Sequence, residues 1–330
     1  MFYHIYWKVI VRLAVILIIM MFAVVSNAQV LPVEHFANLP DTSNVNLSPD
    51  GSKIVSLQRV DNKDSKGQAV VLYTPKNNKQ KILLFSDNSK YFIYRLQWKD
   101  NEHLLIHTYY PDQRDTYMGL GQVKYDSRET RLLIVNVHSG EVRTPFTRAF
   151  LKQFRYLPSE LNEVIDTLPE DPDHILMELP LTKPRSEGDA NSTTVYKVNI
   201  KNKSIKIVQE SMDYVAQWQT DRQHKIRLAH RYENGITTIL IKSLATDKWQ
   251  ALWSYKVFSA DEVQVLGFGY DGNIVYISAY HDNRKAIFKV NLTDSKLNRE
   301  LIWTDTDYDV DGHLIYNKTT KCLKTYIKKF

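Results

Sequence analysis

The chain has 330 residues, a mass of 38.6 kDa and 43% hydrophobic residues, which is enough for one large domain or two smaller ones. The formal net charge of +6 is modest, and no basic run with interleaved aromatic residues argues for nucleic-acid binding. Cys322 is the only cysteine, so an intramolecular disulfide and a cysteine-based metal site are both excluded. The fold must therefore be stabilised by a large hydrophobic core.

Residues 1–28 differ in composition from the rest of the chain. Lys8 and Arg12 precede an apolar run over residues 13–25, and small residues follow up to Ala28. This pattern predicts a secretory signal peptide, cleaved after Ala28, and hence a periplasmic or secreted protein. Cleavage would remove two positive charges and leave a formal charge of +4. An uncleaved membrane anchor is the alternative, because the apolar residues between Lys8 and Arg12 lengthen the run toward membrane-spanning size.

A tight polar turn followed by a short β-branched strand recurs along the chain. The clearest copy is Ser48-Pro49-Asp50-Gly51, in which proline presets φ, aspartate bonds the backbone and glycine accepts a positive φ. Looser copies follow, and we call the six of them the marker turns. Their central residues are Gly51, Asn101, Asp173, Gln223, Gly272 and Gly312, which subtraction of these numbers places 50, 72, 50, 49 and 40 residues apart. Four of the five spacings lie near the roughly 40–50 residues of one β-propeller blade.

Alternating strands separated by polar turns follow most marker turns. The predicted hairpins pair 70–73 with 82–85, 132–137 with 141–143, 195–200 with 205–208, 238–241 with 249–253, and 287–292 with the segment up to 297. The 72-residue spacing between Asn101 and Asp173 contains a polar, glycine-containing insertion at 109–128, and a degenerate blade within the same stretch is a further alternative. Residues 148–157 are the only plausible helical stretch, and 180–194 is an expected exposed loop.

These units predict an all-β chain. Four-stranded sheets cannot bury both faces alone, whereas several packed radially can do so and leave only short edges. We therefore expect a single β-propeller domain of about six to eight blades over residues 29–330, possibly incomplete at its C-terminus, after the signal peptide.

Catalytic motifs are missing from this pattern. No serine lies in Gly-x-Ser-x-Gly, the elbow that an α/β-hydrolase requires, and no βαβ alternation could carry one. The pairs Gly119-Leu120-Gly121 and Gly267-Phe268-Gly269 lack the third glycine of a dinucleotide site and are interpreted as loop and strand-bend glycines. We assign no catalytic and no cofactor-binding residue.

Two groups of residues superficially suggest a metal. His103 and His107 share one face of a strand, but no third ligand is evident, and polar residues of a blade edge are the preferred interpretation. In residues 307–312 every second residue is an aspartate, as in a calcium-binding loop. Lys318, however, occupies the position of the bidentate glutamate, so we interpret this segment as a turn. We assign no metal site. Five of the six tryptophans could stack on ligands, but a core role is favoured for each of the five: Trp98, Trp218, Trp249, Trp253 and Trp303.

The chain resembles the N-terminal β-propeller of the prolyl oligopeptidase family of serine peptidases, in its dipeptidyl-peptidase and acylaminoacyl-peptidase branch. The resemblance rests on residues 47–54, on 133–142 (Leu-Ile-Val-Asn-Val-His-Ser-Gly-Glu-Val), on 168–176 and on 308–312. Ser-Pro-Asp-Gly alone is shared by many propellers, and the combination is more specific. In that family the propeller covers a C-terminal α/β-hydrolase domain, which holds the catalytic Ser, Asp and His, and filters or positions peptide substrates.

The resemblance implies fold and ancestry, not activity of this chain by itself. The chain ends at Phe330 shortly after the last expected strand, so we expect the hydrolase domain to be absent and the chain to be inactive alone, because acyl transfer needs an activated nucleophile and an oxyanion hole. The preferred hypothesis is the non-catalytic propeller of a truncated or split secreted peptidase, with a hydrolase domain of the same family as partner. The alternative is a stand-alone periplasmic propeller that binds a peptide, protein or other ligand.

Overall fold

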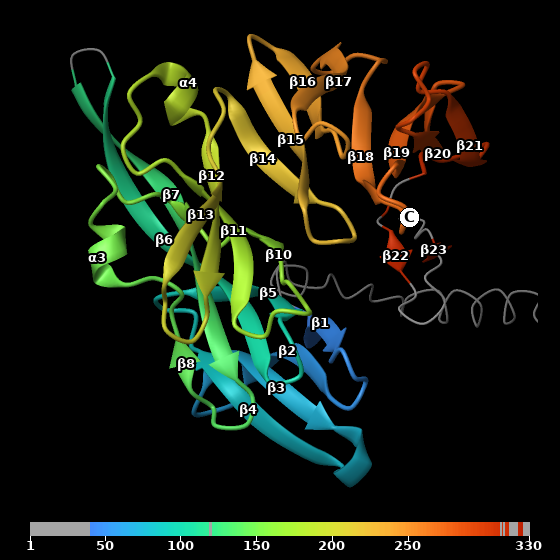
Figure 1. Ribbon diagram of the computed structural model, residues 1–330. Helices are drawn as coiled ribbons and strands as arrows, with labels where there is room; N and C mark the ends of the chain where they lie inside the picture. Colours follow the sequence, from blue (N-terminus) through green and yellow to red (C-terminus); the bar gives the residue numbers. More distant parts are fainter. Residues whose placement is uncertain (1–39, 119–120, 311, 313, 317–322, 326–330) are drawn as a thin grey trace, which may run out of the picture. The chain divides into compact units, whose positions relative to one another are not determined.

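The computed structural model describes residues 40–118, 121–310, 312, 314–316 and 323–325 (Figure 1). The predicted signal peptide, residues 1–28, lies outside the described residues. The chain divides into two units, 1–40 and 41–330, and everything below concerns the second. No helix in the described part of the chain is long and apolar enough to cross a bilayer.

Five antiparallel sheets follow one another along the chain, and we call them blades 1 to 5. In each blade, four strands are hydrogen-bonded in chain order. Blade 1 comprises β1 (Thr42–Leu47), β2 (Ile54–Asp61), β3 (Lys66–Thr74) and β4 (Lys79–Ser86). Blade 2 comprises β5 (Phe92–Trp98), β6 (His103–Met118), β7 (Gly121–Asn136) and β8 (Val142–Arg143), with β9 (Glu160–Leu161) parallel to β7. Blade 3 comprises β10 (Val164–Asp166), β11 (His174–Pro180), β12 (Thr193–Asn199) and β13 (Ile205–Gln209).

The two remaining blades repeat the same order. Blade 4 comprises β14 (Val215–Thr220), β15 (Ile226–Glu233), β16 (Ile236–Lys242) and β17 (Trp249–Lys256). Blade 5 comprises β18 (Val263–Phe268), β19 (Ile274–His281), β20 (Arg284–Asn291) and β21 (Arg299–Trp303). A two-stranded sheet of β22 (Ile315–Tyr316) and β23 (Leu323–Thr325) follows, and the short helices are η1 (Pro75–Asn77), α3 (Arg148–Leu151) and α4 (Glu187–Ala190). The predicted all-β propeller architecture is confirmed, and the total number of blades stays a prediction.

In every blade, the marker turn joins the first strand to the second. In blade 1, the Asp50 carboxylate accepts hydrogen bonds from the Ser48 hydroxyl at 2.6 Å and the Ser52 backbone N–H at 3.0 Å. These bonds stabilise the carboxylate and lower the pKa of Asp50 to about 2. Hydrogen bonds among neighbouring residues therefore form the turn that ends one strand and starts the next.

The hydrophobic core lies between consecutive blades. Val55 and Leu57 project from one face of β2, as the period of two requires, and pack with Leu104 and Ile106 of blade 2. Three further clusters join blade 2 to 3, 3 to 4 and 4 to 5 in the same way. Each fully buried Val, Leu or Ile contributes about 1.5–3 kcal/mol, so the interfaces between blades are the main source of stability.

The insertion predicted at 109–128 forms no blade. It extends the β6–β7 hairpin, whose strands stay in register from His103 opposite Asn136 to Met118 opposite Gly121, and the hairpin reaches beyond the other strands of blade 2 (Figure 1). The expected helix at 148–157 is present only as α3, the single turn Arg148–Leu151. Phe150 of α3 is buried in the cluster between blades 2 and 3, which ties this connection to the core.

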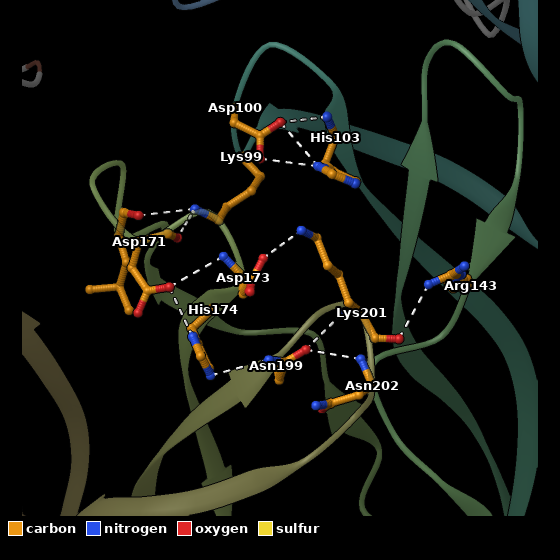
Figure 2. A network of polar contacts seen from close by, with 11 residues as sticks. Lys99, Asp100, His103, Arg143, Asp171, Asp173, His174, Asn199, Lys201 and Asn202 are labelled. Carbon is orange, nitrogen blue, oxygen red and sulfur yellow. Dashed lines mark hydrogen bonds and ion pairs between the residues drawn. The ribbon is translucent and has the colours of Figure 1, made fainter.

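The marker turns of neighbouring blades are bonded to one another. Lys99, at the end of β5, is 2% exposed, and its Nζ donates to the backbone oxygens of Leu168 at 2.9 Å and Asp171 at 2.7 Å in the turn of blade 3 (Figure 2). The Asp171 carboxylate also accepts from His174 Nδ1 at 2.9 Å. The Asp50 backbone N–H in turn donates to the side chain of Asn101 at 3.0 Å, which links blades 1 and 2. The turns thus add polar links to the apolar contacts between blades.

Candidate functional site

A cavity of about 950 Å³ lies where blades 3, 4 and 5 meet, and we call it the Glu178 cavity. Its walls come from segments far apart in the sequence. They are residues 160 and 163–165 before and within β10, 178 and 180 of β11, 193 of β12, 216–219 of β14, 230 and 232 of β15, 237 of β16, 255 of β17, and 257–258 and 262–265 around β18. First strands of three successive blades line it, so its composition depends on how these blades pack.

Acidic side chains dominate the charge of the lining. Glu160, Glu163, Glu178 and Glu262 line the cavity, whereas none of its described lining residues is a lysine or arginine. Lys285 Nζ lies 3.4 Å from Glu262 Oε1 and balances the charge of that carboxylate. The other three glutamates gather on the blade 3 side, where Glu160 and Glu163 make the wall favourable for a positively charged ligand.

Glu178 is the most perturbed of these groups. It lies on β11 with its backbone N–H bonded to the Glu163 carbonyl at 3.2 Å, and its Oε2 accepts from the Trp218 backbone N–H at 2.9 Å. Burial, reinforced by the negative charges of Glu163 and Glu160, raises the pKa of Glu178 to about 8. At neutral pH this side chain is a neutral carboxylic acid that can donate as well as accept a hydrogen bond.

His230 and two aromatic side chains form the part of the lining that belongs to blade 4. Burial lowers the pKa of His230, so the imidazole is neutral at pH 7, and its ring stacks with that of Tyr232 at 6.5 Å between centroids. The Tyr255 hydroxyl donates to the Val263 carbonyl at 2.9 Å, which fixes it between blades 4 and 5. Phe258 is 99% exposed beside the opening. This combination of flat apolar surface and a few oriented polar groups is typical of a ligand pocket.

The chemistry of the lining indicates binding rather than acyl transfer. None of the described lining residues is a serine or cysteine, and both lining threonines already have partners. The Thr193 hydroxyl accepts from Trp218 Nε1 at 3.0 Å, and the Thr237 side chain is hydrogen-bonded to Tyr255. A nucleophile next to a base, which covalent catalysis requires, is not formed by the described lining residues. The cavity can instead hold a cationic or amphipathic ligand against carboxylates and aromatic rings.

The two histidines weighed as metal ligands have different partners. His103 Nδ1 lies 3.0 Å from the Asp100 carboxylate. His107 is 1% exposed rather than at a blade edge, and its Nδ1 lies 3.2 Å from Asn162 Nδ2. Burial and the charge of Arg95 lower the pKa of His107 to about 4. Among the described residues, no group of three or more His, Cys, Asp or Glu side chains is placed to hold a metal ion.

The aspartate-rich segment 307–312 forms a turn against blade 5. Asp309 Oδ1 accepts from the Lys285 backbone N–H at 2.8 Å, and the Val310 N–H donates to the Lys285 carbonyl at 2.8 Å. Asp311 lies outside the described residues. The segment therefore docks on the edge of β20, in agreement with the preferred interpretation as a turn.

The remaining candidates have structural roles where they are described. Gly267 lies at an irregularity of the β18 register with φ +152, and a Cβ there would lie 2.8 Å from the Tyr316 hydroxyl, so it is a strand-bend glycine as predicted. Trp98 and Trp218 are buried in the clusters between blades, as the core interpretation predicts, and Trp218 also lines the Glu178 cavity. Trp249, Trp253 and Trp303 are partly buried on outer strands.

Comparison with known proteins supports the fold. No family model and no curated protein matches the chain. A structure from the work "Structural and Mechanistic Analysis of Two Prolyl Endopeptidases" is similar with a TM-score of 0.53 and 12% identity, over 83% of this chain and 37% of that one. An oligogalacturonate lyase in complex with manganese has a TM-score of 0.49 and 10% identity, over 84% of this chain and 72% of that one. TolB from Acinetobacter baumannii has a TM-score of 0.38 and 13% identity, over 76% of this chain and 52% of that one.

These similarities show the fold alone. The chain spans about half of the TolB chain and little more than a third of the prolyl endopeptidase chain. The propeller part of the predicted resemblance is thereby supported, because a prolyl endopeptidase shares this fold with a TM-score of 0.53.

Sequence reasoning assigned none of the cavity residues. One signal was present at Glu178: in the predicted strand that follows the third marker turn, it alternates onto the same face as Leu176, which is 5% exposed. A carboxylate on the buried face of a strand marks either a buried pair or a cavity wall. His230 carries the same signal, because it alternates onto the same face as the buried Leu228, whereas Glu160 and Glu163 carry none.

Proposed function

We propose that this chain is the propeller part of a secreted prolyl-oligopeptidase-like serine peptidase, in which it binds and positions peptides for a hydrolase domain. The Glu178 cavity carries the proposal: it is large enough for several amino-acid residues, and both acidic and aromatic side chains line it. The fold shared with a prolyl endopeptidase is compatible with this role. The preferred ligand is a peptide with a free amino terminus or a basic side chain near one end.

Peptide binding tests the role of the cavity. Fluorescently labelled peptides with a free amino terminus should bind saturably, and N-acetylation should weaken binding of those without other positive charges. The variant Glu160→Gln/Glu163→Gln removes two carboxylates of the acidic wall and should weaken binding about tenfold, whereas Glu170→Gln, an exposed glutamate of the blade 3 turn, should have no effect. Binding that ignores both the peptide charge and the double substitution would contradict the proposal.

The relation to a hydrolase domain needs a separate measurement. The native protein from its own cells is weighed intact and treated with a serine-reactive fluorophosphonate probe. A labelled species, either heavier than this chain by a whole domain or copurifying with it, is the expected result. An unlabelled species of the fragment mass that nevertheless binds peptides would favour the alternative, a stand-alone binding propeller.

Secretion is part of the same proposal. The composition of residues 1–28 supports it, and N-terminal sequencing of the native protein should begin at Gln29. An intact Met1 on a membrane-bound protein would instead indicate an anchored form.

A further inference from the structure

The outer part of the β6–β7 hairpin has no neighbouring strand within the described residues. β5 accompanies β6 only as far as Tyr109, and β9 pairs with β7 only at Thr130 and Arg131. Between these points, residues 110–118 pair with 121–129 in unbroken register, and we call this two-stranded ribbon the blade 2 arm. Figure 1 shows the arm as the upper end of β6 and β7, beyond the other strands of blade 2.

The base of the arm is held firmly. The rings of Phe92 and Tyr109 stack at 4.9 Å with an interplanar angle of 10°, and the Arg128 guanidinium lies 4.9 Å from the centre of the Tyr109 ring. The arm is therefore aimed in a defined direction rather than joined by a loose linker. Such preorganisation lowers the entropic cost of docking.

The free edges of the arm are available for strand pairing. A two-stranded ribbon is marginally stable in water, and unpaired backbone N–H and C=O groups attract another strand. The β6 edge is interrupted by Pro111, which has no N–H to donate. The β7 edge, residues 121–129, contains no proline. The β7 edge is thus the one suited to accept a partner strand.

The charges along the β7 edge match a second copy of the same edge. In an antiparallel pair centred on Tyr125, Lys124 stands opposite Asp126 of the partner subunit, and the two-fold axis repeats the contact. Lys124 and Asp126 are both exposed, and no like charges face each other elsewhere in this register. We propose that the blade 2 arms of two chains pair through their β7 edges and form a symmetric dimer.

Charge reversal with rescue tests this pairing. Sedimentation equilibrium of the full chain in mild detergent gives the dimer dissociation constant. Lys124→Glu and Asp126→Lys each place two pairs of like charges across the interface and should raise that constant about tenfold. The double variant Lys124→Glu/Asp126→Lys restores two opposite-charge pairs and should return it to near the original value.

A cysteine variant provides a second, independent measurement. Residues directly opposite in an antiparallel pair have Cα atoms about 4.5–5.5 Å apart, which suits a disulfide. In a Cys322→Ser background, Tyr125→Cys should therefore form a disulfide-linked dimer on mild oxidation, whereas Asp112→Cys on the β6 edge should not. The proposal would be overturned if the chain stayed monomeric or if the single charge reversals left the dissociation constant unchanged. It would also be overturned if the double variant did not restore that constant, or if Tyr125→Cys and Asp112→Cys cross-linked equally.

Discussion

At the scale of single residues, Glu178 shows how packing changes the chemistry of a side chain. A glutamate on an exposed strand face would be ionised at pH 7, but here neighbouring blades remove water and Glu163 and Glu160 add negative potential. The carboxyl group is consequently neutral when an ordinary carboxyl would be charged. A hydrogen-bond donor among the acceptor oxygens of the neighbouring glutamates gives the cavity two kinds of hydrogen-bonding group on one wall.

The pKa of Glu178 predicts a pH dependence of stability. The folded pKa of about 8 exceeds the ordinary 4.5, so the folded chain holds a proton that the unfolded chain releases between these values. Stability from this group is complete below pH 4.5 and is lost as the pH rises through 8. At about 1.4 kcal/mol per pKa unit, the loss has an upper limit of about 5 kcal/mol.

Urea unfolding of Glu178→Gln measures this contribution. The variant keeps an acceptor for the Trp218 N–H but cannot ionise, so its free energy of unfolding should fall less than that of the wild type between pH 6.5 and 8. This window avoids His107, whose lowered pKa makes stability rise between about pH 4 and 6.5. Glu170→Gln serves as the exposed control, and parallel slopes for wild type and Glu178→Gln would contradict the assignment.

At the scale of strands and turns, two glycines allow backbone strain to be separated from steric clash. Gly67 of β3 has φ +151, and a Cβ there would lie 2.0 Å from the Ser86 carbonyl oxygen of β4. Gly235, in the β15–β16 turn, has φ +74 with nothing within 4 Å. A side chain at position 67 would both clash with the backbone of β4 and adopt an unfavourable φ. A side chain at position 235 would only adopt an unfavourable φ.

Alanine substitutions should therefore differ in cost. Gly235→Ala is expected to lower the free energy of unfolding by about 1 kcal/mol, because a left-handed conformation costs a Cβ-bearing residue about that much. Gly67→Ala should cost more than about 3 kcal/mol, since β3 and β4 must also move apart. Denaturant titration of both variants measures the difference, and equal costs would show that the strand pairing at Ser86 is not as tight as described.

At the scale of the whole molecule, blades are joined by both apolar clusters and bonds between marker turns. Lys99 is the clearest polar link, because its buried ammonium group joins blade 2 to two carbonyl oxygens of the blade 3 turn (Figure 2). Burial lowers the pKa of Lys99, because removing the ammonium group from water costs free energy. The two hydrogen bonds to the carbonyl oxygens offset part of that cost.

Replacement of this link should be costly. Lys99→Met has a similar shape but leaves the Leu168 and Asp171 carbonyls without their donor, and should lower the free energy of unfolding by about 2–4 kcal/mol. Lys201→Met removes an exposed ion pair with Asp173 in the same region and should cost less than about 1 kcal/mol. Similar losses from the two substitutions would mean that the link between blades adds little.

Features that depend on neighbouring residues were predictable from the sequence. Turn chemistry at 48–51 and period-two alternation such as that of 195–200 depend only on residues a few positions apart, so the all-β repeat and the hairpins could be predicted, as could the short helix within 148–157. The insertion at 109–128 was recognised, but its arrangement as a long hairpin was not, because strand propensity does not say how far a ribbon continues.

The candidate site was decided by tertiary structure. Glu160, Glu178 and His230 lie on or beside different strands, and nothing local in the sequence states that they line one cavity. Nothing local in the sequence indicates that Lys99 is buried either. A lysine in a turn is ordinarily exposed, and Lys99 is buried only because the next blade covers it. The sequence by itself determined the repeating unit, because turn residues and the alternation of apolar and polar residues act over a few positions. Burial, altered pKa values and the cavity arise only when one blade packs against the next.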